Sequence, residues 1–376
     1  MKRRASIGLA LALTALLGAG TASATFTNLY VFGDSLSDSG NLFALTGGTL
    51  PPSPPYAGKM SNGPVAVEYL AANLGLPIAP AGIPLVPGYD LGGNNFALVG
   101  AATGMVPTRF VAGGPYDNYA AFSDNYPPSA DALNGISGID KQVLGFGVRN
   151  SFVADPNALY VVWGGPNDAY IALEDPPITT QGRPLVMNAI AVEAATRAAG
   201  DIGTSVATLA AMGARHFLVP NIPDLSMTPD ALFGPGMGLY GTQYAPALHQ
   251  YSLTFNDLLD DAVLAALGVP LSVLGIDIGF VDVFAEFEAL LSDPSLVGQV
   301  PCILVDACVA NPVVAESFVF WDTVHPTTAG HRRLGEVFTA AALRSPGAVP
   351  EPATVALLVL GLAGLGALRR GRRRQG

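Results

Sequence analysis

Short apolar runs alternate with longer amphipathic stretches through the central part of the chain, and this alternation constrains the fold most. Five runs are predicted as buried strands because they are short and apolar, and four of them stop at glycine or proline. The predicted strands cover residues 29–32, 95–99, 158–163, 216–219 and 271–276. Helical spacing of apolar residues predicts helices at residues 65–74, 136–148, 189–212, 248–267, 281–291 and 327–343. The alternation predicts an α/β fold, with a mostly parallel sheet covered by helices on both faces.

Three polar segments directly follow the carboxyl ends of predicted strands. Gly33-Asp34-Ser35 follows the first strand, Gly100 the second, and Gly165-Pro166-Asn167 the third. Ligands of parallel α/β sheets bind at this edge, so we expect the three segments to converge there. Ser35 is the most informative residue, because the strand fixes its backbone while the turn exposes its hydroxyl, as a hydrolase nucleophile requires.

A serine nucleophile needs a histidine base and an acid that fixes the histidine tautomer. Of the four histidines, only His325 has an acid three residues earlier, and a turn would let this Asp322 accept from its Nδ1. Pro326 restricts the chain directly after the histidine. The other three histidines are interpreted as structural or solvent-facing. His216 lies in a predicted strand, His249 in a predicted helix, and His331 on a solvated helix face beside Arg332 and Arg333.

The negative oxygen that forms during acyl transfer needs hydrogen-bond donors aimed at it. The backbone N–H of Ser35 is one candidate. Gly100 is a second, because a residue without a side chain lets the backbone approach a substrate closely. The side-chain amide of Asn167 is a third, and its alternative role is turn formation, which is common for asparagine after Gly-Pro.

Together these segments resemble a known family. Residues 33–41 (Gly-Asp-Ser-Leu-Ser-Asp-Ser-Gly-Asn) resemble the first block of the GDSL, or SGNH, hydrolases. Residues 95–101 look like their second block, residues 163–168 like the third and residues 322–326 like the fifth, all in family order. The Asp-Ser-Gly-Asn extension at residues 38–41 and the Phe-Trp-Asp-x-x-His-Pro ending at residues 320–326 look most like the lipase/acylhydrolase branch. One departure is Val99, where relatives often carry glycine, and we expect it to affect substrate fit more than mechanism.

This resemblance implies a three-layer α/β/α sandwich with a five-stranded parallel sheet, and chemistry without a metal or other cofactor. It implies that Ser35 is the nucleophile, His325 the base and Asp322 the acid. It further implies an oxyanion hole made by the amides of Ser35 and Gly100 with the side chain of Asn167.

The amino-terminal segment, residues 1–24, is predicted to be a signal peptide that signal peptidase removes. It has a basic start, an apolar stretch over residues 5–20 and a small-x-small cleavage site at Ala22-Ser23-Ala24. A retained membrane anchor is the alternative. The hydrolase domain is then expected to cover residues 25–348.

The carboxyl-terminal segment, residues 349–376, combines Val-Pro-Glu-Pro, an apolar run at 355–368 and an arginine cluster. It resembles the PEP-CTERM sorting signal of Gram-negative bacteria. The resemblance implies transient membrane association through the apolar helix and removal of the tail by an exosortase-type protease. It also implies export to the cell surface or extracellular matrix.

The charge of the chain becomes more negative without its ends. Eight of the 18 basic residues and one of the 29 acidic residues lie in the two terminal segments. The remaining body has 10 basic and 28 acidic residues, a net charge near −18. Such a surface repels nucleic acid and anionic membranes and suits a soluble exported protein.

Cys302 and Cys308 are the only cysteines of the chain. They are close in sequence, and export permits oxidation, so a disulfide that closes a small loop is predicted. Free thiols or metal binding are the alternatives. Two cysteines without a nearby histidine pair make a poor zinc site.

The sequence thus predicts an exported serine esterase or lipase that cleaves carboxylic esters through an acyl-enzyme. Lipid esters, O-acetyl groups on polysaccharide and thioesters all fit this machinery, as does an acyltransferase. A non-catalytic surface or matrix binding protein is the alternative from another class. Segments 45–64 and 107–128, which carry proline and tyrosine, are interpreted as either pocket walls or surface packing.

Overall fold

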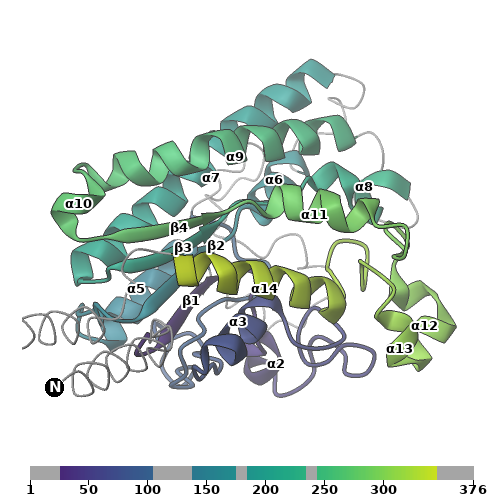
Figure 1. The fold of residues 1–376 in the computed structure, drawn as a ribbon, viewed down its shortest axis with the longest axis horizontal. Helices are drawn as coiled ribbons and strands as arrows, with labels where there is room; N and C mark the ends of the chain where they lie inside the picture. The colour runs from purple at the N-terminus through teal and green to yellow at the C-terminus, as the bar shows by residue number, and fades with distance from the viewer. Residues whose placement is uncertain (1–25, 105–137, 175–183, 234–243, 345–376) are drawn as a thin grey trace, which may run out of the picture. The chain divides into compact units, whose positions relative to one another are not determined.

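Four parallel strands form the central sheet of the structure (Figure 1). They are β1 (Leu29–Gly33), β2 (Leu159–Trp163), β3 (His216–Pro220) and β4 (Asp277–Val281), hydrogen-bonded in the order β1-β2-β3-β4. The last residues of neighbouring strands pair, Gly33 with Trp163 and Pro220 with Val281. The carboxyl ends of the strands therefore lie along one edge of the sheet, where β1 and β2 lead into two of the predicted polar segments.

The computed structural model describes residues 26–104, 138–174, 184–233 and 244–344. The chain divides into two units, residues 26–342 and the two chain ends, and the sheet belongs to the first. The predicted signal peptide, the sorting segment and segment 107–128 lie outside the described residues. Among the described helices, none is both long and apolar enough to cross a membrane.

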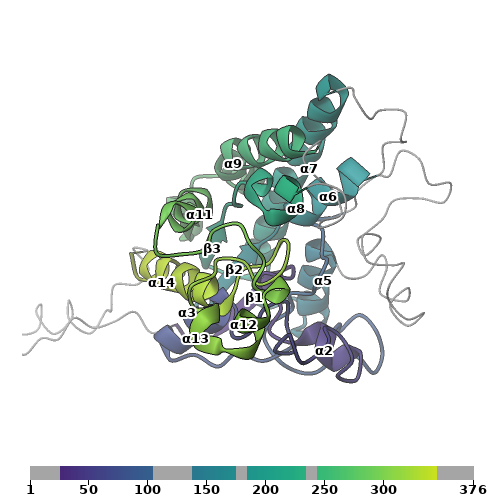
Figure 2. The same cartoon turned by 90° about the vertical axis from the view of Figure 1, so that its right-hand side faces the viewer.

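Apolar core covers both faces of the sheet at β2, whose five residues are all buried, and alternate residues of a strand point to opposite sides. Tyr160 and Val162 of β2 belong to one core cluster, while Val161 and Trp163 belong to another. Figures 1 and 2 show helices on each side of the strands, which gives three layers. The first cluster includes α5 (Ile139–Arg149), α7 (Pro184–Met212) and α9 (Ala245–Leu267), and the second includes α3 (Ala66–Leu74) and α14 (Thr328–Arg344).

Shorter elements complete the fold. They are α2 (Asn41–Leu45), α6 (Pro166–Glu174), α8 (Pro229–Phe233), α10 (Leu271–Leu274), α11 (Val283–Ser292), α12 (Asp306–Ala310), α13 (Pro312–Ala315) and the 3₁₀ turns η3 (Leu225–Met227) and η4 (Cys302–Leu304). Most of these lie in connections that follow the carboxyl ends of strands, which is the side of the sheet where the polar segments gather.

The predicted α/β class with a parallel sheet is confirmed, but the described residues form four strands instead of five. Segment 95–99 lies beside β1 and donates the amides of Phe96 and Leu98 to it, yet it pairs with β1 only through the isolated bridge of Val31 with Asn95. Side chains satisfy its outer edge: Asn41 donates to the carbonyls of Asn95 and Ala97, and Asn95 accepts from the Ala97 amide. These local hydrogen bonds take the place of a longer strand ladder.

The predicted strand at residues 271–276 is wrong in its placement. Residues Leu271–Leu274 form the short helix α10, which ends at Gly275 in the left-handed conformation with φ 61°. The strand that pairs with β3 is the next segment, Asp277–Val281. Its partly exposed residues include Asp and Gly, so it carries a weaker apolar signal than the helix before it. The helix predicted at 281–291 accordingly begins two residues later, as α11.

Candidate active site

Ser35 stands in a tight turn directly after β1. The carboxylate of Asp34 accepts from the Leu36 amide at 2.9 Å, and the Asp34 carbonyl accepts from the amide of Ser37. Gly33 is required before the turn, because a Cβ there would lie 2.5 Å from the Trp163 carbonyl oxygen. The result is a serine held by backbone contacts on both sides, with its side chain at the edge of the sheet.

The structure brings Ser35, His325 and Asp322 together across almost the whole chain. His325 Nε2 lies 2.9 Å from Ser35 Oγ, and His325 Nδ1 lies 2.9 and 2.8 Å from the two carboxylate oxygens of Asp322. All three residues are less than a tenth exposed. The contacts form one continuous hydrogen-bonded chain from hydroxyl to imidazole to carboxylate.

Asp322 and His325 are held by the turn that they share. The Asp322 carboxylate accepts from the amides of Val324 at 3.0 Å and His325 at 2.8 Å, while the Trp321 amide donates to the His325 carbonyl. Burial raises the pKa of Asp322, but the positive charge of His325 and these hydrogen bonds outweigh burial and leave that pKa below its usual value. The carboxylate therefore stays ionised beside the imidazole.

Asp322 has a further hydrogen-bond partner that sequence reasoning missed. The hydroxyl of Tyr56 donates to Asp322 Oδ2 at 2.9 Å. The only signal for it was the interpretation of segment 45–64 as a pocket wall, and Tyr56 does line the cavity beside Ser35. A contact across 266 residues leaves no local spacing pattern in the sequence.

Asn167 and the loop after segment 95–99 meet beside Ser35. Asn167 lies in the first turn of α6, lines the same cavity as Ser35, and donates from Nδ2 to the Ala101 carbonyl at 3.0 Å. Gly100, directly before Ala101, has a φ of 80°, which favours glycine. Because an amide group has two N–H bonds, the contact with Ala101 occupies one and leaves the second for a ligand.

Asp168 fastens the same loop to α6 through Thr103. Its two carboxylate oxygens accept from the amide and the hydroxyl of Thr103, both at 2.9 Å. Arg197 of α7 lies 3.9 Å away. Burial raises the pKa of Asp168 to about 7 despite the opposing effects of Arg197 and Thr103. The loop that carries Gly100 is thus tied to the helix that carries Asn167 at two points.

A cavity of about 230 Å³ opens in front of Ser35 and His325. Its polar groups include Asn167, Asp34 and Asp322, which gather around the serine. Most of the remaining wall is apolar or aromatic: Leu36, Met60, Trp163, Pro223, Leu225, Val283, Phe287, Phe320, Val324 and Leu334. Such a lining accommodates a hydrocarbon chain next to a reactive polar group.

Comparison with known proteins places the chain in a family. A family model described as GDSL-like Lipase/Acylhydrolase matches residues 29–338. The chain belongs to the GDSL-like lipase/acylhydrolase family. The matched range includes every residue of the hydrogen-bonded chain and of the cavity, so the family predicted from four sequence blocks is confirmed.

Three curated relatives resemble this GDSL-like chain at modest identity. The Phosphatidylcholine-sterol acyltransferase of Aeromonas hydrophila is 26% identical, over 83% of this chain and 88% of the acyltransferase. Esterase EstA of Pseudomonas aeruginosa is 29% identical, over 86% of this chain but 48% of the esterase. The Thermolabile hemolysin of Vibrio parahaemolyticus is 26% identical, over 81% of this chain and 61% of the hemolysin. The chain therefore spans about half the length of the esterase that it matches.

A second family model, the PEP-CTERM protein-sorting motif, matches residues 348–374. The predicted sorting signal at the carboxyl end of the GDSL-like chain is thereby confirmed. The motif indicates export in a Gram-negative bacterium and a surface or extracellular location.

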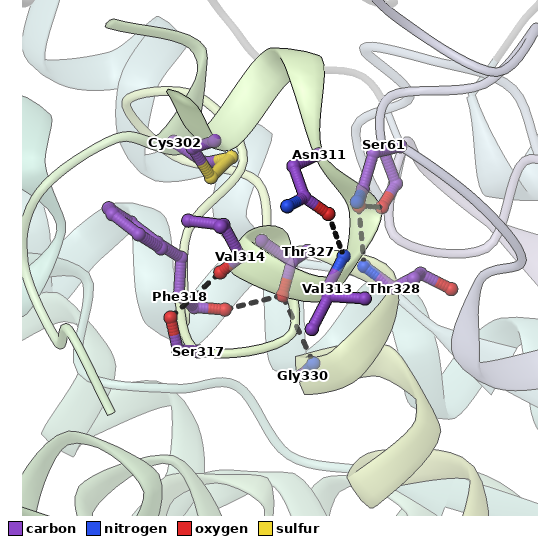
Figure 3. Close-up of a disulfide and its surroundings, with 12 residues drawn as sticks. Ser61, Cys302, Asn311, Val313, Val314, Ser317, Phe318, Thr327, Thr328 and Gly330 are labelled. Carbon is purple, nitrogen blue, oxygen red and sulfur yellow. Dashed lines mark hydrogen bonds between the residues drawn. A yellow bond between two sulfur atoms is a disulfide. The ribbon is translucent and has the colours of Figure 1, made fainter. Parts of the chain in front are cut away.

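Cys302 and Cys308 form a disulfide in the GDSL-like domain, with a Cα–Cα distance of 5.5 Å. The closed ring lies against the residues that lead into the turn of residues 322–326, called the His325 turn below. The amide of Cys302 donates to the Phe320 carbonyl and that of Ile303 to the Trp321 carbonyl. Figure 3 shows the same region, where the hydroxyl of Thr327 donates to the Phe318 carbonyl at 2.6 Å. The disulfide ring and Thr327, directly before α14, thus hold the segment that leads into this turn.

The prediction that His331 faces solvent is wrong. His331 lies in α14 and is fully buried against α3, where its Nδ1 accepts from the Ala66 amide at 3.3 Å. Burial lowers its pKa to about 3, so the ring is neutral. His216 and His249 lie in β3 and α9 as predicted, and His249 Nδ1 lies 2.7 Å from Asp224 Oδ2. Among the described residues, no three His, Cys, Asp or Glu side chains are grouped to hold a metal ion.

The free energy of unfolding of the GDSL-like domain is expected to fall less between pH 4 and pH 7 when asparagine replaces Asp34. Burial raises the pKa of Asp34 to about 7, although the Leu36 amide and His325 lower it. The folded state therefore binds a proton that the unfolded state has released, so the Asp34 contribution to stability falls as pH rises through this range. Asparagine stays neutral and still accepts from Leu36.

Melting temperatures from pH 4.5 to pH 8 check this prediction. The melting temperature of Asp34→Asn minus that of the wild type should increase with pH across this range. A difference that does not change with pH for Asp34→Asn would contradict the assignment of a neutral buried carboxyl.

Proposed function

We propose that the protein is an exported serine hydrolase that cleaves carboxylic esters. The observation that supports this most directly is the continuous contact from Ser35 Oγ through the His325 ring to Asp322. In this proposal Ser35 is the nucleophile, His325 the general base and Asp322 the acid that fixes the histidine tautomer.

The reaction proceeds in two steps. Ser35 Oγ attacks the acyl carbonyl while His325 Nε2 removes the proton of the serine hydroxyl. His325 then gives this proton to the alcohol, which leaves. Water, activated by the same histidine, then hydrolyses the acyl-enzyme. The amides of Ser35 and Gly100 and the free N–H of Asn167 stabilise the negative oxygen in both steps.

The lining of the cavity favours an ester with a hydrocarbon chain over an acetylated sugar. Aromatic and aliphatic side chains such as Phe287, Phe320 and Leu225 form most of its wall. A medium-length acyl chain would bury apolar surface there, at about 25 cal/mol for each Å² removed from water. An acetyl group would leave most of this wall uncovered, so polysaccharide O-acetyl groups are the less favoured substrate.

Acyl transfer to an alcohol other than water is the second candidate. The relative that this chain covers most completely of the three compared above is named as an acyltransferase. The chemistry at Ser35 is the same in both cases until the acyl-enzyme forms. Which acceptor then attacks depends on the alcohol that the open cavity can bind.

The predicted signal peptide and the sorting motif support the proposed location at the cell surface. In this proposal signal peptidase removes residues 1–24 during export. The apolar run at 355–368 then associates transiently with the membrane until an exosortase-type protease removes the tail. The mature enzyme acts on lipid or other apolar esters at the cell surface.

Labelling by a fluorophosphonate tests the function. The mature protein should react at Ser35, as shown by mass spectrometry, and should hydrolyse p-nitrophenyl esters with a preference for chains of about four to twelve carbons over acetate. An unlabelled protein that turns over no ester would favour the non-catalytic binding protein. A protein that deacetylates glycans and leaves longer esters intact would overturn the substrate class, and product formation only with an added alcohol would identify an acyltransferase.

A further inference from the structure

Segment 51–61 contacts the His325 turn at both ends of that turn. The hydroxyl of Tyr56 donates to Asp322 Oδ2 at 2.9 Å, and the hydroxyl of Ser61 donates to the Pro326 carbonyl at 3.0 Å. The segment is itself fixed, because the Tyr56 amide donates to the Pro52 carbonyl and Lys59 forms an ion pair with Glu68 of α3 at 2.7 Å. Tyr56 therefore approaches Asp322 from a fixed segment that is distant in sequence.

The ring of Tyr56 is held as well as its hydroxyl. It lies edge-on to Trp321, with ring centroids 6.2 Å apart and planes at 80°. Trp321 is buried with the Cys302–Cys308 disulfide in one apolar cluster, against which Tyr56 packs. The aromatic contact fixes the direction in which the hydroxyl points, so the hydrogen bond to Asp322 needs little further ordering.

We propose that Tyr56 is a positioning residue for ester hydrolysis, which holds the Asp322 carboxylate in the orientation that receives the Nδ1 hydrogen of His325. This inference rests on the proposed function. Tyr56 contacts the acid and acts on the reaction through Asp322 and His325.

The hydrogen bond also affects how strongly Asp322 stabilises a protonated His325. A carboxylate that accepts from a phenol has part of its charge satisfied, so it attracts the imidazolium less. Removing the hydroxyl strengthens that attraction, and the histidine then keeps its proton to a higher pH. Among the described residues, the other titratable groups that face this pair are Asp34 after β1, Tyr170 in α6, Asp230 in α8 and His331 in α14, and Lys59 acts on His331. None of these is changed by the substitution of Tyr56.

Tyr56→Phe in the mature protein tests the proposal, because phenylalanine keeps the ring against Trp321. With a p-nitrophenyl ester as substrate, we expect kcat to fall about threefold to tenfold, with KM within about twofold of the wild type. We also expect the acidic limb of the kcat/KM profile to move to higher pH by several tenths of a unit.

Tyr69→Phe is the matched control. The Tyr69 hydroxyl is also partly buried and lies 2.8 Å from Oγ1 of Thr328 in α14, and Tyr69 does not line the cavity that Asp322 lines. This variant should keep both kcat and the pH profile. Wild-type kinetics in Tyr56→Phe would overturn the proposal, as would a lower kcat with an unmoved acidic limb. Failure of the wild type to label with fluorophosphonate or to hydrolyse any ester would instead overturn the proposed function.

Discussion

Replacing Ser35 with alanine is expected to abolish ester turnover, with a fall in kcat of about 10⁴-fold or more. The Ser35 hydroxyl is the group in contact with His325 Nε2, so its removal leaves the base with no nucleophile to activate. The oxyanion donors proposed above would still bind the substrate but would support only slow attack by water. Initial rates with a p-nitrophenyl ester, together with loss of fluorophosphonate labelling, provide the measurement.

Ser37→Ala is the matched control for this variant. Ser37 lies in the same turn and is fully buried, but its hydroxyl has no hydrogen-bond partner among the described residues. Its loss should leave kcat within about twofold of the wild type. Both variants should keep the circular dichroism spectrum of the wild type. If Ser35→Ala retained activity while folded, another residue would have to be the nucleophile.

Replacing Asn167 with alanine is expected to lower kcat by about 10² to 10³-fold, with a much smaller change in KM. One N–H of the Asn167 side chain is fixed on the Ala101 carbonyl, so the second has a defined direction before the substrate binds. A donor that is already oriented costs no reorganisation when negative charge develops on the substrate oxygen. Its loss therefore weakens binding of the transition state more than binding of the ester.

Asn73→Ala provides the control, because Asn73 is exposed on α3, where its side-chain amide donates to the Thr339 hydroxyl at 3.0 Å. This substitution should leave kcat unchanged. Asn167→Asp adds a second test, since it keeps the shape of the side chain but removes its donors. If Asn167→Ala raised KM and left kcat intact, Asn167 would be a substrate-binding residue or the turn residue that its Gly-Pro context also suggests.

The residues around Ser35 show which parts of the site are visible in a sequence. Asp322 and His325 were predicted because both belong to one turn, where an offset of three residues is a local signal. Ser35 and Asn167 were predicted because each follows a strand, and the carboxyl ends of parallel strands meet at one edge. Tyr56 was missed because its contact with Asp322 depends on how two loops pack, and no spacing in either loop indicates it.

The differences in the fold have a similar cause. Residues 271–276 are more apolar than residues 277–281, yet Gly275 ends a helix there and the less apolar segment joins the sheet. The strand is partly exposed at the sheet edge, where burial imposes no strong apolar pattern. His331 was misjudged because Arg332 and Arg333 beside it face solvent, whereas a helix turns by about 100° at each residue and directs its neighbour inward.

The position of the Cys302–Cys308 ring has a consequence for the life of the protein before export. The amides of Cys302 and Ile303 in this ring donate to the carbonyls of Phe320 and Trp321, immediately before Asp322. Disulfides persist in oxidising compartments and are rare in the cytoplasm. The newly made chain therefore lacks this covalent support while it is still inside the cell that produces it. The segment that leads into the turn of Asp322 and His325 thus gains its covalent support only after export.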